Sequence, residues 1–322
     1  TTLTAENGDI ELLGKLNLVN GGKVELKAEN GTVNLNGALS MISGGATVTA
    51  ENIKINDDES GKYQTYFDSA ELEAILPAGS PITEALGELG LTDLLGSTGV
   101  NAGIVAGGAD LTATGDITTG GTVGILVNTP VSEMMKEFAS FTEHGQETWL
   151  AYQLLQKGVA TKVTSTDGNI NLASRLNVVH GGNITDASEA LQLSAEKGAV
   201  KMNGSANLVS GNVTVDANDI IMKGEPLKFD TGDALDGMPG GVILDKLAAR
   251  GSANMVTGGA TLTATNNIQL NSMANFVLDT ELVDPIEAFM ERDLAPLMTG
   301  GSKTTTLTAE NGDIELLGKL NL

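Results

Sequence analysis

The feature that most constrains the fold is a short pattern repeated about every 22 residues. LTAENGDI at Leu3–Ile10 returns as LKAENGTV at Leu26–Val33 and as VTAENIKI at Val48–Ile55. Each copy alternates apolar and polar residues, turns at a Gly- or Asn-containing segment and then alternates again, which is typical of short, half-buried strands. A chain of this kind has to stack its repeats, because one repeat cannot bury its own apolar face. Weaker copies occur at Leu111–Ile117, Val163–Ile170, Leu193–Val200 and Leu262–Ile268.

Two longer periods organise the chain. The segment Thr1–Leu18 returns letter for letter as Thr305–Leu322, an offset of 304 residues. Thr1–Gly22 also aligns with Thr161–Gly182. We therefore expect a first half-unit at 1–160, a second at 161–304, and the start of the next identical 304-residue unit at 305–322. We also expect both ends of the chain to be cut surfaces of a longer tandem array.

Pairs of glycines mark a second recurring corner, because glycine adopts the positive φ angles of tight turns without strain. Strands separated by regular corners predict an all-β fold, a right-handed parallel β-solenoid in which successive coils stack about 4.8 Å apart. The spacings of leucine-rich repeats and of calcium-binding nonapeptide repeats are missing. The glycine pairs are Gly21–Gly22, Gly44–Gly45, Gly107–Gly108, Gly181–Gly182 and Gly258–Gly259.

Four stretches interrupt the strand pattern and are predicted to contain short amphipathic α-helices. In the second, Thr129 and Pro130 form a typical helix start, and Met134 and Phe138 then fall on one face. We expect these insertions to cover apolar faces or edges of the solenoid. They lie near 68–96, 129–158, 230–250 and 280–298.

The charge of the chain restricts its partners. Its 18 basic and 41 acidic residues give a net charge of −23. This argues against binding to nucleic acid or to anionic lipid head groups, both of which need clustered Lys and Arg. No apolar stretch is long enough to span a bilayer, so no membrane insertion is expected in this segment. The chain has no cysteine, which excludes disulfides and thiolate chemistry.

No catalytic, cofactor-binding or metal-binding residues are predicted, and no cofactor is expected. His144 and His180 are each isolated in the sequence. The acidic run Asp57–Asp58–Glu59 could offer oxygen ligands to calcium, but it lacks the spacing of a known calcium loop and is interpreted as a solvated turn. Trp149 and Tyr152 share a face of an expected helix, where packing on the solenoid is favoured over a recognition patch.

Two structural roles are predicted for residues of the coils. Asparagines near the turns should align between coils into hydrogen-bonded ladders. Equivalent apolar residues should point inward, whereas the ten aromatic residues are expected in or near the insertions and not in the coils. The asparagines are Asn17, Asn20, Asn30, Asn34, Asn36, Asn52, Asn169, Asn171, Asn177 and Asn203. The inward residues are Leu3, Ile10, Leu26, Val33, Val48 and Ile55.

The form LTAxGDIxL…L…GG, seen best at Leu3–Leu18 and Gly107–Ile117, resembles the haemagglutinin-type repeats of filamentous haemagglutinin-like exoproteins. These are giant tandem-repeat surface proteins of Gram-negative bacteria, exported by two-partner secretion. The resemblance implies a β-solenoid at the bacterial cell surface or outside the cell. The exact 304-residue period and the four insertions depart from the simple family repeat.

These observations lead to three interpretations of function. The leading one is a non-enzymatic structural repeat of a fibre or stalk, whose partners are copies of itself placed end to end. The alternative is an adhesin whose insertions bind a cell-surface glycan, a matrix polysaccharide or a protein receptor. The third is a carbohydrate-active enzyme with carboxylates along one solenoid face.

Overall fold

The computed structural model describes residues 1–57, 101–128, 160–182, 190–224, 252–279 and 303–322. All regular elements in these ranges are β-strands. The strands are β1 (Thr2–Ala5), β2 (Ile10–Leu12), β3 (Leu16–Asn20), β4 (Glu25–Leu35), β5 (Leu39–Ser43), β6 (Thr47–Ile55), β7 (Ala102–Ala106), β8 (Asp110–Ala113), β9 (Ile117–Thr119), β10 (Val123–Val127), β11 (Lys162–Ser165), β12 (Ile170–Leu172), β13 (Leu176–His180), β14 (Leu191–Gly204), β15 (Ala206–Ser210), β16 (Val213–Gly224), β17 (Ala253–Thr257), β18 (Thr261–Ala264), β19 (Ile268–Asn271), β20 (Ala274–Leu278), β21 (Thr306–Ala309), β22 (Ile314–Leu317) and β23 (Leu320–Asn321).

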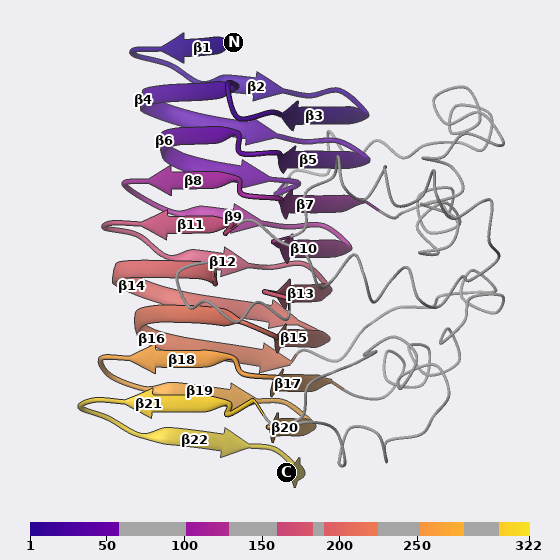
Figure 1. The fold of residues 1–322 in the computed structure, drawn as a ribbon, viewed down its shortest axis with the longest axis vertical. Helices are drawn as coiled ribbons and strands as arrows, with labels where there is room; N and C mark the ends of the chain where they lie inside the picture. Colours follow the sequence, from indigo (N-terminus) through magenta and orange to yellow (C-terminus); the bar gives the residue numbers. More distant parts are fainter. Residues whose placement is uncertain (58–100, 129–159, 183–189, 225–251, 280–302) are drawn as a thin grey trace, which may run out of the picture.

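The strands form two sheets in which every described pairing is parallel. Sheet A has 14 strands and follows the order β1-β4-β6-β8-β11-β14-β16-β18-β21, with β2, β9, β12, β19 and β22 paired beside this path. Sheet B has nine strands and runs from β3 to β23 in chain order. Each coil of the chain passes twice through sheet A and once through sheet B. Nine coils therefore stack in sequence order, with the two ends of the chain at opposite ends of the stack (Figure 1).

The predicted all-β class with parallel strands is confirmed, and the arrangement is compatible with a parallel β-solenoid. The strand pattern also recurs along the stack. Coils one and four have separate strands in the two passes through sheet A, whereas coils two and three have one long strand, β4 or β6. The same order returns in coils five to eight, where β14 and β16 are the long strands. The division into half-units at 160 and 161 stays a prediction, and the insertions near 68–96, 129–158, 230–250 and 280–298 lie outside the described residues.

The core between the sheets is built from columns of equivalent residues. In the first column Leu3 pairs with Leu26 and Leu26 with Val48. Leu26 and Val48 are buried, as predicted, because coils lie on both sides of them. Leu3 lies in the same column through its pairing with Leu26, but it belongs to the first coil and is 45% exposed, because a coil lies on one side of it only.

The second column corrects one predicted equivalence. Ile10 pairs with Val33, but Val33 pairs with Ile53 and not with Ile55. The turn inside β6 is shorter than that inside β4, and the register shifts between Ala28 and Thr32 to absorb the difference. Ile55 is still buried, one inward position further along the strand.

The outer face of sheet B is also apolar. In β5, Ile42 belongs to the core between the sheets. Its neighbour Met41 points the other way, because side chains alternate along a strand, and packs with Leu39 into a second apolar cluster. Ile104 of β7 and Val123 of β10 extend this second cluster along the stack. Sheet B thus presents apolar side chains on both of its faces.

Two further sequence predictions can be compared with the structure. The glycine corners are confirmed at Gly107 and Gly108, where φ is 56° and 78°. The expectation that the coils hold no aromatic residue is wrong, because Phe276 lies in β20. Among the described residues, no helix is long and apolar enough to cross a membrane.

Candidate functional site: inter-coil ladders and end coils

A row of asparagine side chains on sheet B links successive coils, and we call it the amide ladder. Each side-chain nitrogen donates a hydrogen bond to the side-chain oxygen of the asparagine in the next coil. The members are buried, with the exception of the last. The bonds are Asn177 to Asn207 (2.8 Å), Asn207 to Asn254 (2.8 Å), Asn254 to Asn275 (3.0 Å) and Asn275 to Asn321 (2.8 Å).

The ladder residues also bond to the backbone, so their polar atoms are paired despite burial. Asn177 Nδ2 donates to the carbonyl of Ser174 at 2.9 Å, and Asn254 Nδ2 donates to that of Met222 at 2.8 Å. A buried amide without partners would be costly, whereas a satisfied chain of amides is rigid and tolerates one register only. The amide ladder therefore fixes how each coil sits on the previous one.

A second polar row runs through the first coils at the same position of sheet B. Asn17 Nδ2 donates to Ser40 Oγ at 3.2 Å, and Ser40 Oγ donates to Asn56 Oδ1 at 2.8 Å. The following two strands of sheet B place Gly103 and Gly124 in this column. The column thus carries polar side chains in seven of the nine coils.

The turn of sheet A carries another ladder, which we call the turn ladder. In it an Asp or Asn side-chain oxygen accepts a hydrogen bond from the backbone N–H of the next coil. The described acceptor and donor pairs are Asp9 and Thr32 (2.7 Å), Asn52 and Asp116 (2.9 Å), Asp116 and Asn169 (2.7 Å), Asn169 and Ala199 (3.0 Å), Asp219 and Asn267 (3.1 Å), and Asn267 and Asp313 (3.0 Å).

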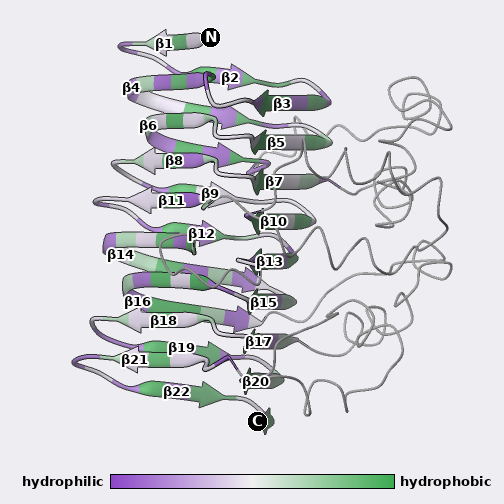
Figure 2. Cartoon of the chain, viewed as in Figure 1, coloured by the Kyte–Doolittle hydropathy of each residue, from purple (hydrophilic) through white to green (hydrophobic). Residues whose placement is uncertain are grey.

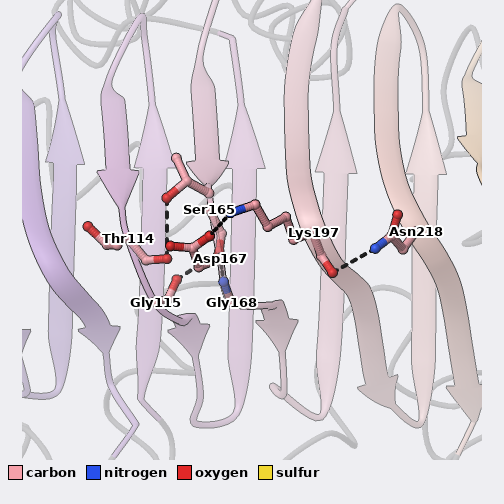
Figure 3. A network of polar contacts seen from close by, with 8 residues as sticks. Thr114, Gly115, Ser165, Asp167, Gly168, Lys197 and Asn218 are labelled. Atoms are coloured by element: carbon pink, nitrogen blue, oxygen red, sulfur yellow. Dashed lines mark hydrogen bonds and ion pairs between the residues drawn. The ribbon is translucent and has the colours of Figure 1, made fainter.

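Figure 3 shows a neighbouring network that crosses four consecutive coils at this turn. Ser165 Oγ donates to the carbonyl of Gly115 at 2.7 Å, and Asn218 Nδ2 donates to the carbonyl of Lys197 at 2.7 Å. Lys197 Nζ lies 2.5 Å from Asp167 Oδ1. This hydrogen bond, together with the attraction between the charges, raises the pKa of Lys197. The pair is exposed, so it adds little to stability and the buried ladders dominate.

The end coils differ from the others in exposing large apolar side chains. Of the nine such residues among the described ones, eight lie in the two copies of the duplicated segment. The apolar colour of β22 at the lower end of the stack is visible in Figure 2. Equivalent residues of inner coils, such as Leu26 and Ile268, are buried. The eight are Leu3, Leu16, Leu18, Ile314, Leu316, Leu317, Leu320 and Leu322.

The two copies fold alike although their neighbours differ. β1 and β21 span equivalent residues of the duplicated segment. In the first copy Asn17 Nδ2 donates to the carbonyl of Gly14, and in the second Asn321 Nδ2 donates to that of Gly318. Leu3 pairs with Leu26 in the first coil, and Leu262 pairs with Leu307 in the last. The same sequence thus pairs in the same register whether its neighbouring coil follows it or precedes it.

The residues weighed as possible sites are dispersed. His180 is buried, with Nδ1 2.7 Å from Ser210 Oγ, and so belongs to the packing of sheet B. Asp57 Oδ2 lies 3.7 Å from Lys54 Nζ. Within the described residues, no three His, Cys, Asp or Glu side chains are grouped so as to hold a metal ion. The other candidates, His144, Asp58, Glu59, Trp149 and Tyr152, lie outside the described residues.

The predicted asparagine ladders are present, but their membership differs. Asn17 and Asn177 occupy the sheet B column, and Asn52 and Asn169 accept bonds in the turn ladder. Asn34 and Asn36 instead each bury a side-chain oxygen without a hydrogen-bond partner. The main members that the sequence analysis missed are Asn207, Asn254, Asn275 and Asn321. A recurring signal marks them: Asn follows Ala or Leu in LNLV, LNVV, ANLV, ANMV and ANFV.

Comparison of the chain with protein-family models, with curated proteins and with solved structures gave no match. The resemblance to filamentous haemagglutinin-like exoproteins therefore stays a prediction from the repeats.

Proposed function

We propose that the chain is a non-enzymatic structural repeat of an extracellular or cell-surface fibre, built from tandem β-solenoid units placed end to end. One observation carries the proposal: the duplicated segment occupies the first and the last coil of one stack in equivalent registers. A coil that fits both positions lets units follow one another without a break in either sheet. Repeats that contact only their neighbours form a rod whose length grows with their number.

The finer features of the fold belong to this proposal. The solenoid is right-handed, as crossovers between parallel strands almost always are. The segments near 68–96, 129–158, 230–250 and 280–298 form amphipathic helices that cover the apolar outer face of sheet B. Two observations support this placement. The outer face carries an apolar cluster, with Ala102 and Ala106 almost fully buried. The described ranges also resume at residues 101 and 252, which directly precede β7 and β17 of the same sheet.

The mechanism is mechanical. Eight coil steps separate the two copies of the duplicated segment, and at about 4.8 Å per step each 304-residue unit advances the rod by about 38 Å. The amide ladder and the turn ladder resist slippage between coils, because a shifted register would leave buried polar groups unpaired. The net charge of −23 keeps neighbouring rods apart in solution.

An adhesin is the second candidate function, and the apolar outer face of sheet B is the observation that favours it. In that case the insertions would leave part of this face open to a cell-surface glycan, a matrix polysaccharide or a protein receptor. A filamentous haemagglutinin-like identity and a location at the bacterial surface are compatible with both functions. The third interpretation, a carbohydrate-active enzyme, has no observation in its favour among the described coils.

Electron microscopy of chains with one, two and three tandem units tests the fibre. The proposal predicts straight rods of uniform width whose images show no hinge between units. Beads joined by flexible links would contradict it, because a break in the sheets at the joint would leave each unit free to rotate. A binding screen on glycan arrays with the same chains would separate the adhesin from an inert stalk.

A further inference from the structure

We infer that the duplicated segment is a two-sided joint, through which a second copy of this chain can dock by sharing a single coil. The inference rests on the proposed fibre and adds how two units recognise each other. The partner is another copy of the same chain, because the duplicated segment itself covers the sheet edges of the coils next to the two ends. The edge of coil eight is covered by residues 305–322, and the edge of coil two by residues 1–18 of identical sequence.

In the last coil, one set of backbone groups of the duplicated segment binds the preceding coil, and it includes the carbonyls of Asp313 and Leu322, which accept from Ile268 N and Val277 N. Thr306 N donates to the carbonyl of Ala260, and Glu310 N donates to that of Ala264, each at 2.9 Å. Leu320 N donates to the carbonyl of Met273 at 3.1 Å. These bonds hold the segment against β18 and β20.

In the first coil, a different set of backbone groups of the segment binds the following coil. The carbonyl of Leu12 accepts from Asn36 N, and the carbonyl of Lys15 accepts from Leu39 N, each at 2.9 Å. The carbonyl of Thr1 accepts from Glu25 N at the same distance. None of these backbone groups of the last copy is equivalent to one that the first copy uses, so one coil can make both sets of bonds at once.

The side chains divide in the same way. Asn321 accepts through Oδ1 from the preceding coil, while its equivalent Asn17 donates through Nδ2 to Ser40 of the following one. Likewise, Asp313 donates its N–H to Asn267 Oδ1 of the preceding coil, while the equivalent Asp9 accepts through Oδ1 from Thr32 N of the following one. A shared coil would therefore continue both ladders from one unit into the next.

The two copies of the segment bury different apolar side chains, because each copy has a neighbouring coil on one side only. Ile10 is half-buried in the first coil, where it packs on the core, whereas its equivalent Ile314 is 45% exposed in the last. Leu3 is 45% exposed in the first coil, whereas its equivalent Leu307 packs against the core in the last. A shared coil would have neighbours on both sides and would bury both sets.

The consequence is a head-to-tail exchange between separate chains. If the first coil of one chain is disabled, the edge of its second coil becomes free, and the intact last coil of another chain can occupy it. The same contact can be repeated at the other end, so the assembly is open and grows as a filament. The mode is strand addition to a sheet edge, with specificity from the inward side chains.

Substitutions in one copy at a time test the joint in the full chain. I10D/L12D disables the first copy and the matched I314D/L316D disables the second. Each variant should assemble, with a mass by light scattering that rises with concentration to several times the 33.0 kDa of the monomer. The quadruple variant has no intact copy and should stay at 33.0 kDa. A labelled peptide of sequence 1–18 should bind I10D/L12D, whereas the same peptide carrying both aspartates should not.

Two results would overturn the joint. One is that both single-copy variants remain monomers and fail to bind the intact peptide. The other is that the quadruple variant assembles as readily as they do. If I10D/L12D does not fold, I314D/L316D applies the same test from the other end. The fibre is tested apart from the joint, because straight rods of linked units together with monomeric variants would leave the fibre standing and reject the exchange.

Discussion

Asn254 lies in the middle of the amide ladder, and replacing it with aspartate tests whether the ladder holds the coils together. Its side chain is fully buried. Nδ2 donates to the carbonyl of Met222 and to Asn275 Oδ1, while Oδ1 accepts from Asn207 Nδ2. Asn254→Asp keeps the size and the acceptor but turns the donor into an oxygen that faces two other oxygens.

The magnitude follows from these contacts. Two buried hydrogen bonds are lost, at about 1 kcal/mol each, and their former acceptors remain unpaired. At pH 7 the new carboxylate is also buried without a counter-charge, which brings the expected loss to roughly 3–5 kcal/mol. When the carboxyl is protonated it can donate one of the two bonds again, so the loss at low pH should be about 1–2 kcal/mol.

Burial makes the sign of the pH dependence definite. It raises the pKa of the new carboxyl in the folded state above about 3.9, the value in the unfolded chain. Between these two values the folded state binds more protons, so stability falls as pH rises through that window and stays low above it. Urea unfolding followed by circular dichroism at pH values from 4 to 8 measures this dependence, taking the unsubstituted chain at each pH as the reference.

Asn271→Asp is the matched control, because Asn271 is exposed in β19 of the next coil. It should change the free energy of unfolding by less than about 0.5 kcal/mol. The reasoning fails if the two variants have equal stability at pH 7. It also fails if the Asn254 variant gains stability relative to the unsubstituted chain as the pH rises.

Two further predictions use residues whose equivalents lie in different coils. Leu26→Asp should lose roughly 4–5 kcal/mol because Leu26 is 2% exposed between two coils, whereas Leu3→Asp should lose about 1 kcal/mol; equal losses in urea unfolding would show that the inward column is wrongly assigned. Gly312→Ala would place a Cβ 2.5 Å from Asn267 Oδ1 and should cost about 1–3 kcal/mol, while Gly8→Ala meets nothing within 4 Å. Identical melting curves for the two glycine variants would contradict the stacking of the last coil on coil eight.

Much of the core could be predicted from the sequence because it depends on local alternation. Leu26, Val33 and Val48 repeat the same period-two pattern on either side of a turn, and all three are buried. The equivalence of Ile55 with Val33 failed for a physical reason. β6 makes the turn with fewer residues, so the pairing moves to Ile53, and a count along the chain cannot detect a register shift.

The amide ladder was harder to predict because it depends on which coils become neighbours. Asparagine is common in turns, so the sequence predicts ladders of the asparagines that lie near the turns. The ladder residues lie instead in the strands of sheet B, and neighbours such as Asn207 and Asn254 are 47 residues apart. A motif of Asn before an apolar residue and Val identifies them once the coils are aligned. The exposure of Leu3 and Ile314 could not be predicted from the sequence either, since the same sequence is buried or exposed according to the coil beside it.

The most direct test of continuous stacking is the length that one further unit adds. Small-angle X-ray scattering on chains with one, two and three copies of the 304-residue unit measures the maximum dimension and the cross-section. Stacking through the joint predicts about 38 Å of added length for each unit at constant cross-section, from eight coil steps of about 4.8 Å. An increment that departs clearly from this value, or a cross-section that grows as units are added, would contradict the fibre.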